Sequence, residues 1–181
     1  MDISDVIKTR RSVRSFCNKD VSDELIEKLI AAAMVAPSAG NQQPWHFIVI
    51  RDAKKRAAVP AFHPYCKMIV QTPVAILICG DPEGKKWPDF WPQDCSAAVQ
   101  TLLLAARAEG LGPVWTGVYP LEDRIRGCRE LFMIPDHIIP FALIPIGWPK
   151  EKSFKEVDRF RPELIHRDVF SRRDNALSPP L

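Results

Sequence analysis

The residues best suited to chemistry in this 181-residue chain gather in the segment RRSVR at residues 10–14. Three guanidinium groups and a hydroxyl can chelate a phosphate there, because arginine offers planar, charge-assisted donors that match phosphate oxygens. If the segment is extended, Arg10, Ser12 and Arg14 point the same way, with Arg11 between them. The pattern is compatible with a phosphate site, although a basic run of this kind is more often a solvated turn.

A second segment, PSAGNQQPW at residues 37–45, combines small residues with three consecutive side-chain amides. Such a loop is dense in donors and acceptors, and its glycine lets the backbone approach a flat polar ring closely. An ordinary helix-to-strand turn is the alternative, but that turn would not need Asn41, Gln42 and Gln43 in a row.

Several classes of active site lack their motifs in this sequence. No GxGxxG, GxxxxGK[ST], GxSxG or HExxH occurs, and the four histidines form no ligand cluster. The five cysteines are dispersed without a CxxC pair, which argues against a disulfide framework and against zinc. The N-terminus does not resemble a secretory signal, and no apolar run approaches the length of a membrane span. We therefore expect a cytoplasmic protein without a metal.

Composition favours a globular chain, with 46% apolar and 26% charged residues. We expect one domain over residues 1–170 and a tail over 171–181. The net charge of +3 is too small to predict nucleic-acid binding. Arginines cluster in RRSVR and in a late pair, Arg159 and Arg161, and these short clusters do not point to a nucleic-acid partner, so we expect none.

The elements that must position these segments follow from hydrophobic periodicity. The expected order is helix, helix, strand, strand, long helix, strand, helix, strand, which is α/β or α+β in class. The helices are expected at 3–9, at 21–37 with Ser22 as N-cap, at 93–112 and at 121–132, and the strands at 45–50, 73–80, 113–119 and 140–149.

The long helix at 93–112 is expected to have Asp94 or Ser96 near its start and Gly110 as its C-terminal stop, and nearly every face of it is apolar. Between Cys95 and Ala108 its only polar residues are Ser96, Gln100, Thr101 and Arg107. A helix of this kind must be covered nearly all round, so part of the cover is expected from a second subunit. The alternative is a central helix of a well-packed monomer.

Taken together and in this order, these segments resemble the nitroreductase family of flavin oxidoreductases from about Asp2 to about Asp168. The resemblance is carried by RRSVR, APSAGNQQPWHF, AAVQTLLLAARAEGLGPVW, GVYP, IPIGWP and RFRP. It implies an α+β fold in which a central, mainly antiparallel sheet is flanked by helices. It also implies a homodimer that holds tightly bound FMN at the subunit interface.

The resemblance also implies a role for each matched segment. The early basic segment would grip the FMN phosphate, ribityl chain and pyrimidine edge, and the late basic pair would complete the phosphate grip. The proline-serine loop would come from the other subunit, and the segment after the long helix would lie against the reactive edge of the flavin. The implied cofactor-binding residues are Arg10, Arg11, Ser12, Arg14, Pro37, Ser38, Ala39, Asn41, Gln43, Thr116, Gly117, Arg159 and Arg161, with Val118 as a further candidate.

The implied reaction is ping-pong hydride transfer from NADH or NADPH through flavin N5 to a small flat acceptor such as a nitroaromatic, a quinone or a flavin. The cofactor carries the chemistry, so no catalytic side chain is expected. The alternatives are a specialised relative with a non-nitro substrate and a flavin-binding or sensing protein with little turnover.

This chain departs from the family pattern in three places. It is short enough to lack some helices of the larger members, and Thr116 stands where an acidic residue or glycine is frequent. The third place is the run KKWPDFWP at residues 85–92, which is either a pocket wall or lid, or, as we favour, a loop anchored by two buried tryptophans.

Overall fold

The computed structural model describes residues 1–151, 154–156 and 158–170, and a five-stranded sheet lies at the centre of this part of the chain. The strand order is β1-β2-β5-β3, with β4 also paired to β5, and every pairing is antiparallel. The predicted α+β fold is confirmed. The predicted tail at 171–181 lies outside the described residues. The strands are β1 (Trp45–Ile50), β2 (Val74–Gly80), β3 (Gly112–Pro113), β4 (Thr116–Gly117) and β5 (Ile139–Gly147).

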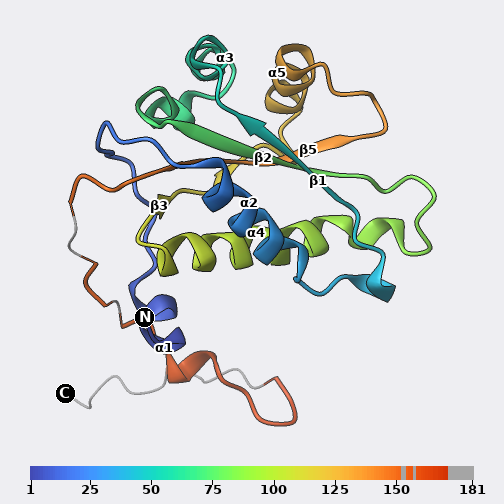
Figure 1. The fold of residues 1–181 in the computed structure, drawn as a ribbon. Helices are drawn as coiled ribbons and strands as arrows, with labels where there is room; N and C mark the ends of the chain where they lie inside the picture. The colour runs from blue at the N-terminus through green and yellow to red at the C-terminus, as the bar shows by residue number, and fades with distance from the viewer. Residues whose placement is uncertain (152–153, 157, 171–181) are drawn as a thin grey trace, which may run out of the picture.

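Helices cover both faces of the sheet (Figure 1). One face packs against α2 (Asp23–Met34) and α4 (Trp91–Ala108), and the other against α5 (Glu122–Phe132) and the 3₁₀ turns at 59–61 and 64–71. Helix α3 (Ala53–Ala58) lies on that second side of the sheet. The short helix α1 (Ile3–Thr9) lies beyond the C-terminal end of α4. Five 3₁₀ turns complete the described elements: η1 (Ala39–Asn41), η2 (Val59–Ala61), η3 (Pro64–Gln71), η4 (Pro88–Phe90) and η5 (Pro162–Leu164).

Strand β2 shows why the sheet needs cover on both faces. All seven of its residues are buried, as its continuous apolar run predicts. Ile76 and Ile78 belong to the core under α2 and α4, while Leu77 and Cys79 belong to the core under α5 and the turns η2 and η3. This alternation follows the two-residue period of a strand.

Helix α2 begins as predicted, because the Ser22 hydroxyl oxygen accepts from the Leu25 amide at 3.3 Å. The single strand expected at 113–119 is wrong in detail, because β3 and β4 are two short strands that both pair with β5. The interruption begins after Pro113, which has no N–H to donate to a ladder.

Helix α4 begins earlier than expected, at Trp91. Phe90 flanks it without a side-chain cap, and Asp94 is a buried member of the helix. After its last residue, Gly110 adopts a left-handed φ of 78°, as expected for a helix stop. Most of its apolar side chains are buried within this chain, so its apolar character does not require a partner. These buried residues are Trp91, Cys95, Ala98, Val99, Leu102, Leu103 and Ala106.

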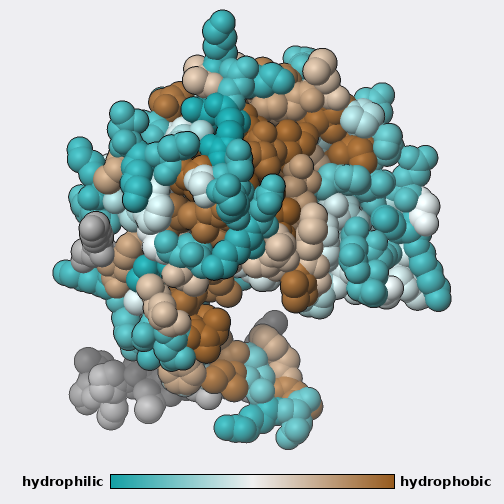
Figure 2. All heavy atoms as spheres, viewed as in Figure 1, coloured by the Kyte–Doolittle hydropathy of each residue, from teal (hydrophilic) through white to brown (hydrophobic). Residues whose placement is uncertain are grey.

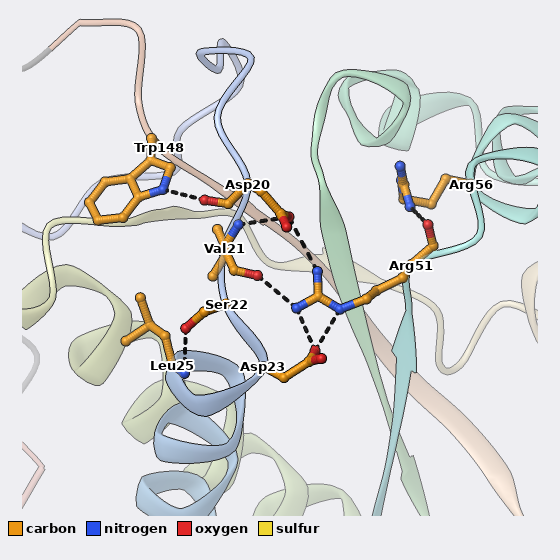
Figure 3. A network of polar contacts seen from close by, with 8 residues as sticks. All are labelled: Asp20, Val21, Ser22, Asp23, Leu25, Arg51, Arg56 and Trp148. Carbon is orange, nitrogen blue, oxygen red and sulfur yellow. Dashed lines mark hydrogen bonds and ion pairs between the residues drawn. The ribbon is translucent and has the colours of Figure 1, made fainter.

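A polar network ties the segment after RRSVR to the sheet (Figure 3). Arg51, just beyond β1, donates from Nη2 to the Val21 carbonyl at 2.7 Å and from Nε to the Asp23 carboxylate at 2.7 Å. Its Nη1 lies 3.3 Å from the Asp20 carboxylate, and Trp148 Nε1 donates to the Asp20 carbonyl at 2.9 Å. The chain leaving RRSVR is therefore anchored at several backbone points.

Candidate functional site

The RRSVR segment lies against the edge of the sheet through its one apolar residue. The Val13 amide donates to the Pro113 carbonyl at 3.1 Å, and the Val13 side chain packs on Gly112. A Cβ on Gly112 would lie 2.7 Å from Val13 Cβ. Phe16 then forms an antiparallel bridge with Pro149. These contacts hold Val13 inward, and the alternation of an extended segment turns its polar neighbours outward.

The outward side chains line a pocket of about 340 Å³. Among the described residues no carboxylate lines it, so four guanidinium groups and one hydroxyl face a shared space. Donors of this kind suit a doubly charged phosphate. The Arg11 guanidinium also donates to the Lys155 carbonyl, which draws the segment after β5 toward the pocket. The lining residues are Arg10, Arg11, Ser12, Arg14 and Arg159.

The pocket unites two segments that are about 150 residues apart in the chain, as expected from the late basic pair. Arg161 is exposed at the start of η5 and is not among the lining residues. The pocket therefore supports Arg159 as a phosphate ligand but does not support the same role for Arg161.

We predict that Gly112→Ala destabilises the protein by about 1–3 kcal/mol, because the new Cβ overlaps Val13 and the packed backbone cannot move freely. Urea unfolding measures the loss. Adding Val13→Ala removes the overlapping atoms and should restore part of the lost stability. A double variant no more stable than Gly112→Ala alone would show that the close packing of Val13 on Gly112 is not the cause.

The proline-serine loop has an unusual backbone. Gly40, Asn41 and Gln43 have left-handed φ values of 55°, 56° and 46°. Such values are uncommon for residues with a side chain, and they persist where surrounding contacts hold them. Here the Ser38 hydroxyl oxygen accepts from the Gln43 amide at 3.0 Å, and the Gln43 side chain donates to Asn41 Oδ1 at 2.9 Å. The loop is thus a fixed turn whose side chains bond to one another.

Asp94 of α4 anchors this loop, a role that the sequence analysis missed. Its buried carboxylate accepts from the Ala39 amide at 2.9 Å and from Gln42 Nε2 at 3.1 Å. Gln42 also exchanges two hydrogen bonds with the Trp87 backbone, at 2.8 Å and 3.1 Å. The only hint of this role in the sequence is that Asp94 is an acid within a largely apolar helix. An acid near the start of a helix is also explained by the helix terminus itself, so the hint does not point to the loop.

The prediction that two buried tryptophans anchor the loop at residues 85–92 is confirmed for only one of them. Trp91 is buried, and a Cβ on Gly80 would overlap its ring. Trp87 is instead about half exposed and lies beside Gly40, 3.1 Å from the position of a Cβ there. The loop is therefore anchored by one buried tryptophan, while the other forms part of the surface next to the 38–43 loop.

We predict that Asp94→Asn lowers the free energy of unfolding by about 1–3 kcal/mol, because an amide nitrogen would face donors that now bond to a carboxylate. Chemical denaturation measures this loss. Asp89→Asn, an exposed acid in the same stretch, is the matched control and should change stability by less than about 0.5 kcal/mol. Equal effects for the two variants would contradict the anchoring role of Asp94.

The 38–43 loop and RRSVR lie at opposite ends of α4 within one chain (Figure 1). Asp94 near the first turn holds the loop, and Arg107 near the last turn donates to Thr9 at 3.0 Å, next to RRSVR. Asp94 and Arg107 are 13 residues apart in the helix, which corresponds to about 20 Å along its axis. The two predicted halves of the site therefore do not meet within one chain.

Strand β4 carries the third predicted segment. The Thr116 side chain is buried and donates to the Leu143 carbonyl at 2.6 Å, so only its backbone is available to a ligand. Gly117 is different, because a Cβ there would have no neighbour closer than the Tyr119 carbonyl at 4.0 Å. Val118 is fully buried. The open face of Gly117 leaves room for a planar ring against the backbone.

Aromatic rings gather beside this strand. Trp91, Tyr119 and Phe141 pack edge to face or stacked, with the Trp91 and Tyr119 centroids 4.8 Å apart, and Trp115 lies 5.9 Å from Phe141. Trp115 and Tyr119 remain partly exposed on either side of Gly117. The surface next to the open glycine is therefore suited to flat ligands.

The titratable groups offer no obvious nucleophile. Burial raises the pKa of the Cys66 thiol to about 11 and the pKa of Cys79, Cys95 and Cys128 to about 12, so all four are protonated at neutral pH. Within the described residues no group of three or more His, Cys, Asp or Glu side chains is arranged to hold a metal ion. No helix in that part of the chain is long and apolar enough to cross a membrane.

The fold and site define a class of protein: an α+β chain with an arginine-lined anion pocket and an open, aromatic-flanked backbone edge. A family model described as the nitroreductase family matches residues 7–74 and 63–148. The chain belongs to the nitroreductase family and is an NAD(P)H-dependent oxidoreductase, as the sequence resemblance predicts.

Individual relatives support this assignment. A Methanothermobacter thermautotrophicus protein, named provisionally as an NADH dehydrogenase or NAD(P)H nitroreductase, is 52% identical over 92% of this chain and 86% of its own length. The crystal structure of a Parabacteroides distasonis protein with the same provisional name has a TM-score of 0.87 at 40% identity, over 93% and 98% of the two chains. A nitroreductase-like protein from Desulfovibrio desulfuricans, solved in complex with FMN, has a TM-score of 0.78 at 30% identity, over 94% and 99%.

Proposed function

We propose that this chain is an FMN-dependent oxidoreductase that passes hydride equivalents from NADH or NADPH to a small flat acceptor. The observation that carries the proposal is the pocket in which four guanidinium groups converge without a carboxylate among the described residues. A phosphate dianion fits that donor set, and the open face of Gly117 accepts a flat ring. The FMN complex of the Desulfovibrio relative supports FMN as the cofactor.

We propose that the phosphate and ribityl chain bind in the arginine-lined pocket, to Arg10, Ser12, Arg14 and Arg159. Arg11 and Arg161 would add positive charge near the same phosphate. The backbone at Thr116 and Gly117 lies along the flavin edge. FMN held by these residues would supply the redox chemistry, which is hydride acceptance from the nicotinamide and delivery of two electrons to the acceptor. The protein orients the ring and offers backbone dipoles, so no side chain need act as a nucleophile.

We further propose that the site is completed by a second copy of this chain in a homodimer. The proline-serine loop lies at the far end of α4 from RRSVR in the same chain, which supports its contribution to the flavin site of the partner. The loop residues proposed for this role are Pro37, Ser38, Ala39, Asn41 and Gln43.

Exposed apolar residues supply surface for such a dimer. Figure 2 shows apolar surface around α1 and the neighbouring segment after β5. Two of these side chains come from α1 and the rest from the segment near the C-terminus. The residues are Ile3, Ile7, Phe160, Leu164, Ile165, Val169 and Phe170. A monomer gains nothing from exposing these side chains together, whereas association would bury them.

The cytoplasm remains the proposed location. All five cysteines are free thiols, and Cys17 is exposed, which suits a reducing compartment.

The purified protein tests the proposed function directly. We expect a yellow protein with a flavin absorption spectrum, whose extracted flavin is FMN and which oxidises NADPH or NADH with menadione or a nitroaromatic as acceptor. A protein that holds FMN but never oxidises nicotinamide would instead be a flavin-binding protein, and the reductase proposal would fail.

A further inference from the structure

The carbonyl side of Gly117 is held by a guanidinium. Arg124 of α5 donates from Nη1 to the Gly117 carbonyl oxygen at 2.7 Å. The position of a Cβ on the same residue is open to 4.0 Å. Gly117 therefore has one side fixed by a cation and another side free for a ligand.

The charge of Arg124 has no counterion in the part of the chain that the structure describes. The ion pairs found there involve other cations, including Arg51 and Arg126, and none involves Arg124. Besides the Gly117 carbonyl, the Arg124 guanidinium contacts the Tyr65 ring, whose centroid lies 5.5 Å from the guanidinium carbon. A neutral carbonyl and an aromatic ring hold a guanidinium in place without cancelling its charge.

The groups packed next to Arg124 are neutral. His63 is 1% exposed and lies next to the Gly117 backbone. Burial, followed by the charge of Arg124, lowers the pKa of His63 to about 4, although the Gly117 carbonyl opposes the fall, so its imidazole is neutral at pH 7. Cys66, which contacts Thr116 at 3.4 Å, keeps its proton as well. A charge next to buried neutral groups is weakly screened and acts over several ångströms.

We propose that Arg124 is a positioning residue for the flavin edge and that its uncompensated charge raises the reduction potential of the bound FMN. This inference rests on the proposed function. The oxidised flavin ring is neutral, whereas the reduced ring carries added negative charge, so a fixed cation bonded to the peptide proposed to face the ring would stabilise the reduced form selectively. The hydrogen bond to the Gly117 carbonyl also fixes the orientation of the peptide that faces the ring.

Two independent changes test the charge. Arg124→Gln keeps a donor for the Gly117 carbonyl but removes the charge, and Arg124→Lys keeps the charge. Tyr65→Glu leaves Arg124 in place and adds an opposing charge at an exposed position, with Tyr65→Gln as its matched control. Arg126→Gln, an exposed cation on the same helix, controls for the change in net charge.

The readouts are the FMN midpoint potential and the ratio of the dissociation constants for oxidised and reduced FMN. We expect more negative potentials in Arg124→Gln and in Tyr65→Glu, with reduced FMN bound at least several-fold more weakly relative to oxidised FMN. Arg124→Lys and Arg126→Gln should match the unmodified protein, and the potential of Tyr65→Glu should be more negative than that of Tyr65→Gln, which loses the same ring without adding a charge. Unchanged potentials in both Arg124→Gln and Tyr65→Glu would overturn the inference. Unmodified protein that binds no FMN would instead overturn the proposed function, so the two failures are distinguishable.

Discussion

Arg10→Ala is expected to give a folded protein that has lost most of its FMN. A hydrogen bond between charged groups contributes about 1.5–3 kcal/mol, which corresponds to about a 10- to 150-fold rise in the FMN dissociation constant. The arginines lie in one pocket, so Arg159→Ala should have a similar effect despite its distance in sequence. The affinity should also fall with added salt, because the contact is ionic.

The measurement is FMN titration followed by flavin fluorescence, with far-UV circular dichroism to verify the fold. Arg126→Ala removes an exposed guanidinium on α5 whose ion pair among the described residues is with Asp123, one turn away, and the variant should bind FMN normally. FMN content that stays unchanged in both Arg10→Ala and Arg159→Ala would refute the phosphate pocket.

Gly117→Val is expected to abolish flavin chemistry with little effect on stability. The Cβ position at Gly117 is open and its φ is not left-handed, so the backbone tolerates a side chain. The added atoms would, however, occupy the space proposed for the ring. A displacement of about 1 Å at a reacting centre can cost about 100-fold in rate.

Rapid-mixing measurement of flavin reduction by NADPH gives this rate, and thermal unfolding gives the stability. We expect reduction at least about 100-fold slower than in the unmodified protein, with a melting temperature changed by only a few degrees. A variant that reduces its flavin at the normal rate would show that the ring does not lie against Gly117.

Local patterns in the sequence predicted much of the fold. The N-cap at Ser22, the apolar run of β2 and the helical period of α2 are properties of neighbouring residues, so each is visible in a short window. The late start expected for α4 was wrong because Asp94 resembles a residue at a helix terminus, whereas its carboxylate bonds to a loop 55 residues earlier.

The same distinction explains what could be predicted of the site. RRSVR and the proline-serine loop were recognised from composition and from the family resemblance. Asp94 and Arg124 were not, because each acts on the backbone of another segment, at Ala39 and Gly117. A single sequence carries no sign of such contacts. The apolar character of α4 was similarly ambiguous, and packing within the chain accounts for most of it.

The central claim is that RRSVR of one chain and the 38–43 loop of another form one FMN site. Subunit mixing tests it most directly. Arg10→Ala/Arg14→Ala and Ser38→Ala/Asn41→Ala are each expected to bind FMN poorly when refolded alone. Refolded together at equal concentration, half of the dimers are mixed, and each mixed dimer has one site built from unaltered segments.

FMN retained after desalting is the measurement, with the separately refolded variants as baseline. We expect recovery of about a quarter of the unmodified FMN content in the mixture, since one site in two is intact in half of the dimers. A site contained within one chain would be damaged in every molecule, so FMN content no higher than the baseline would contradict the account.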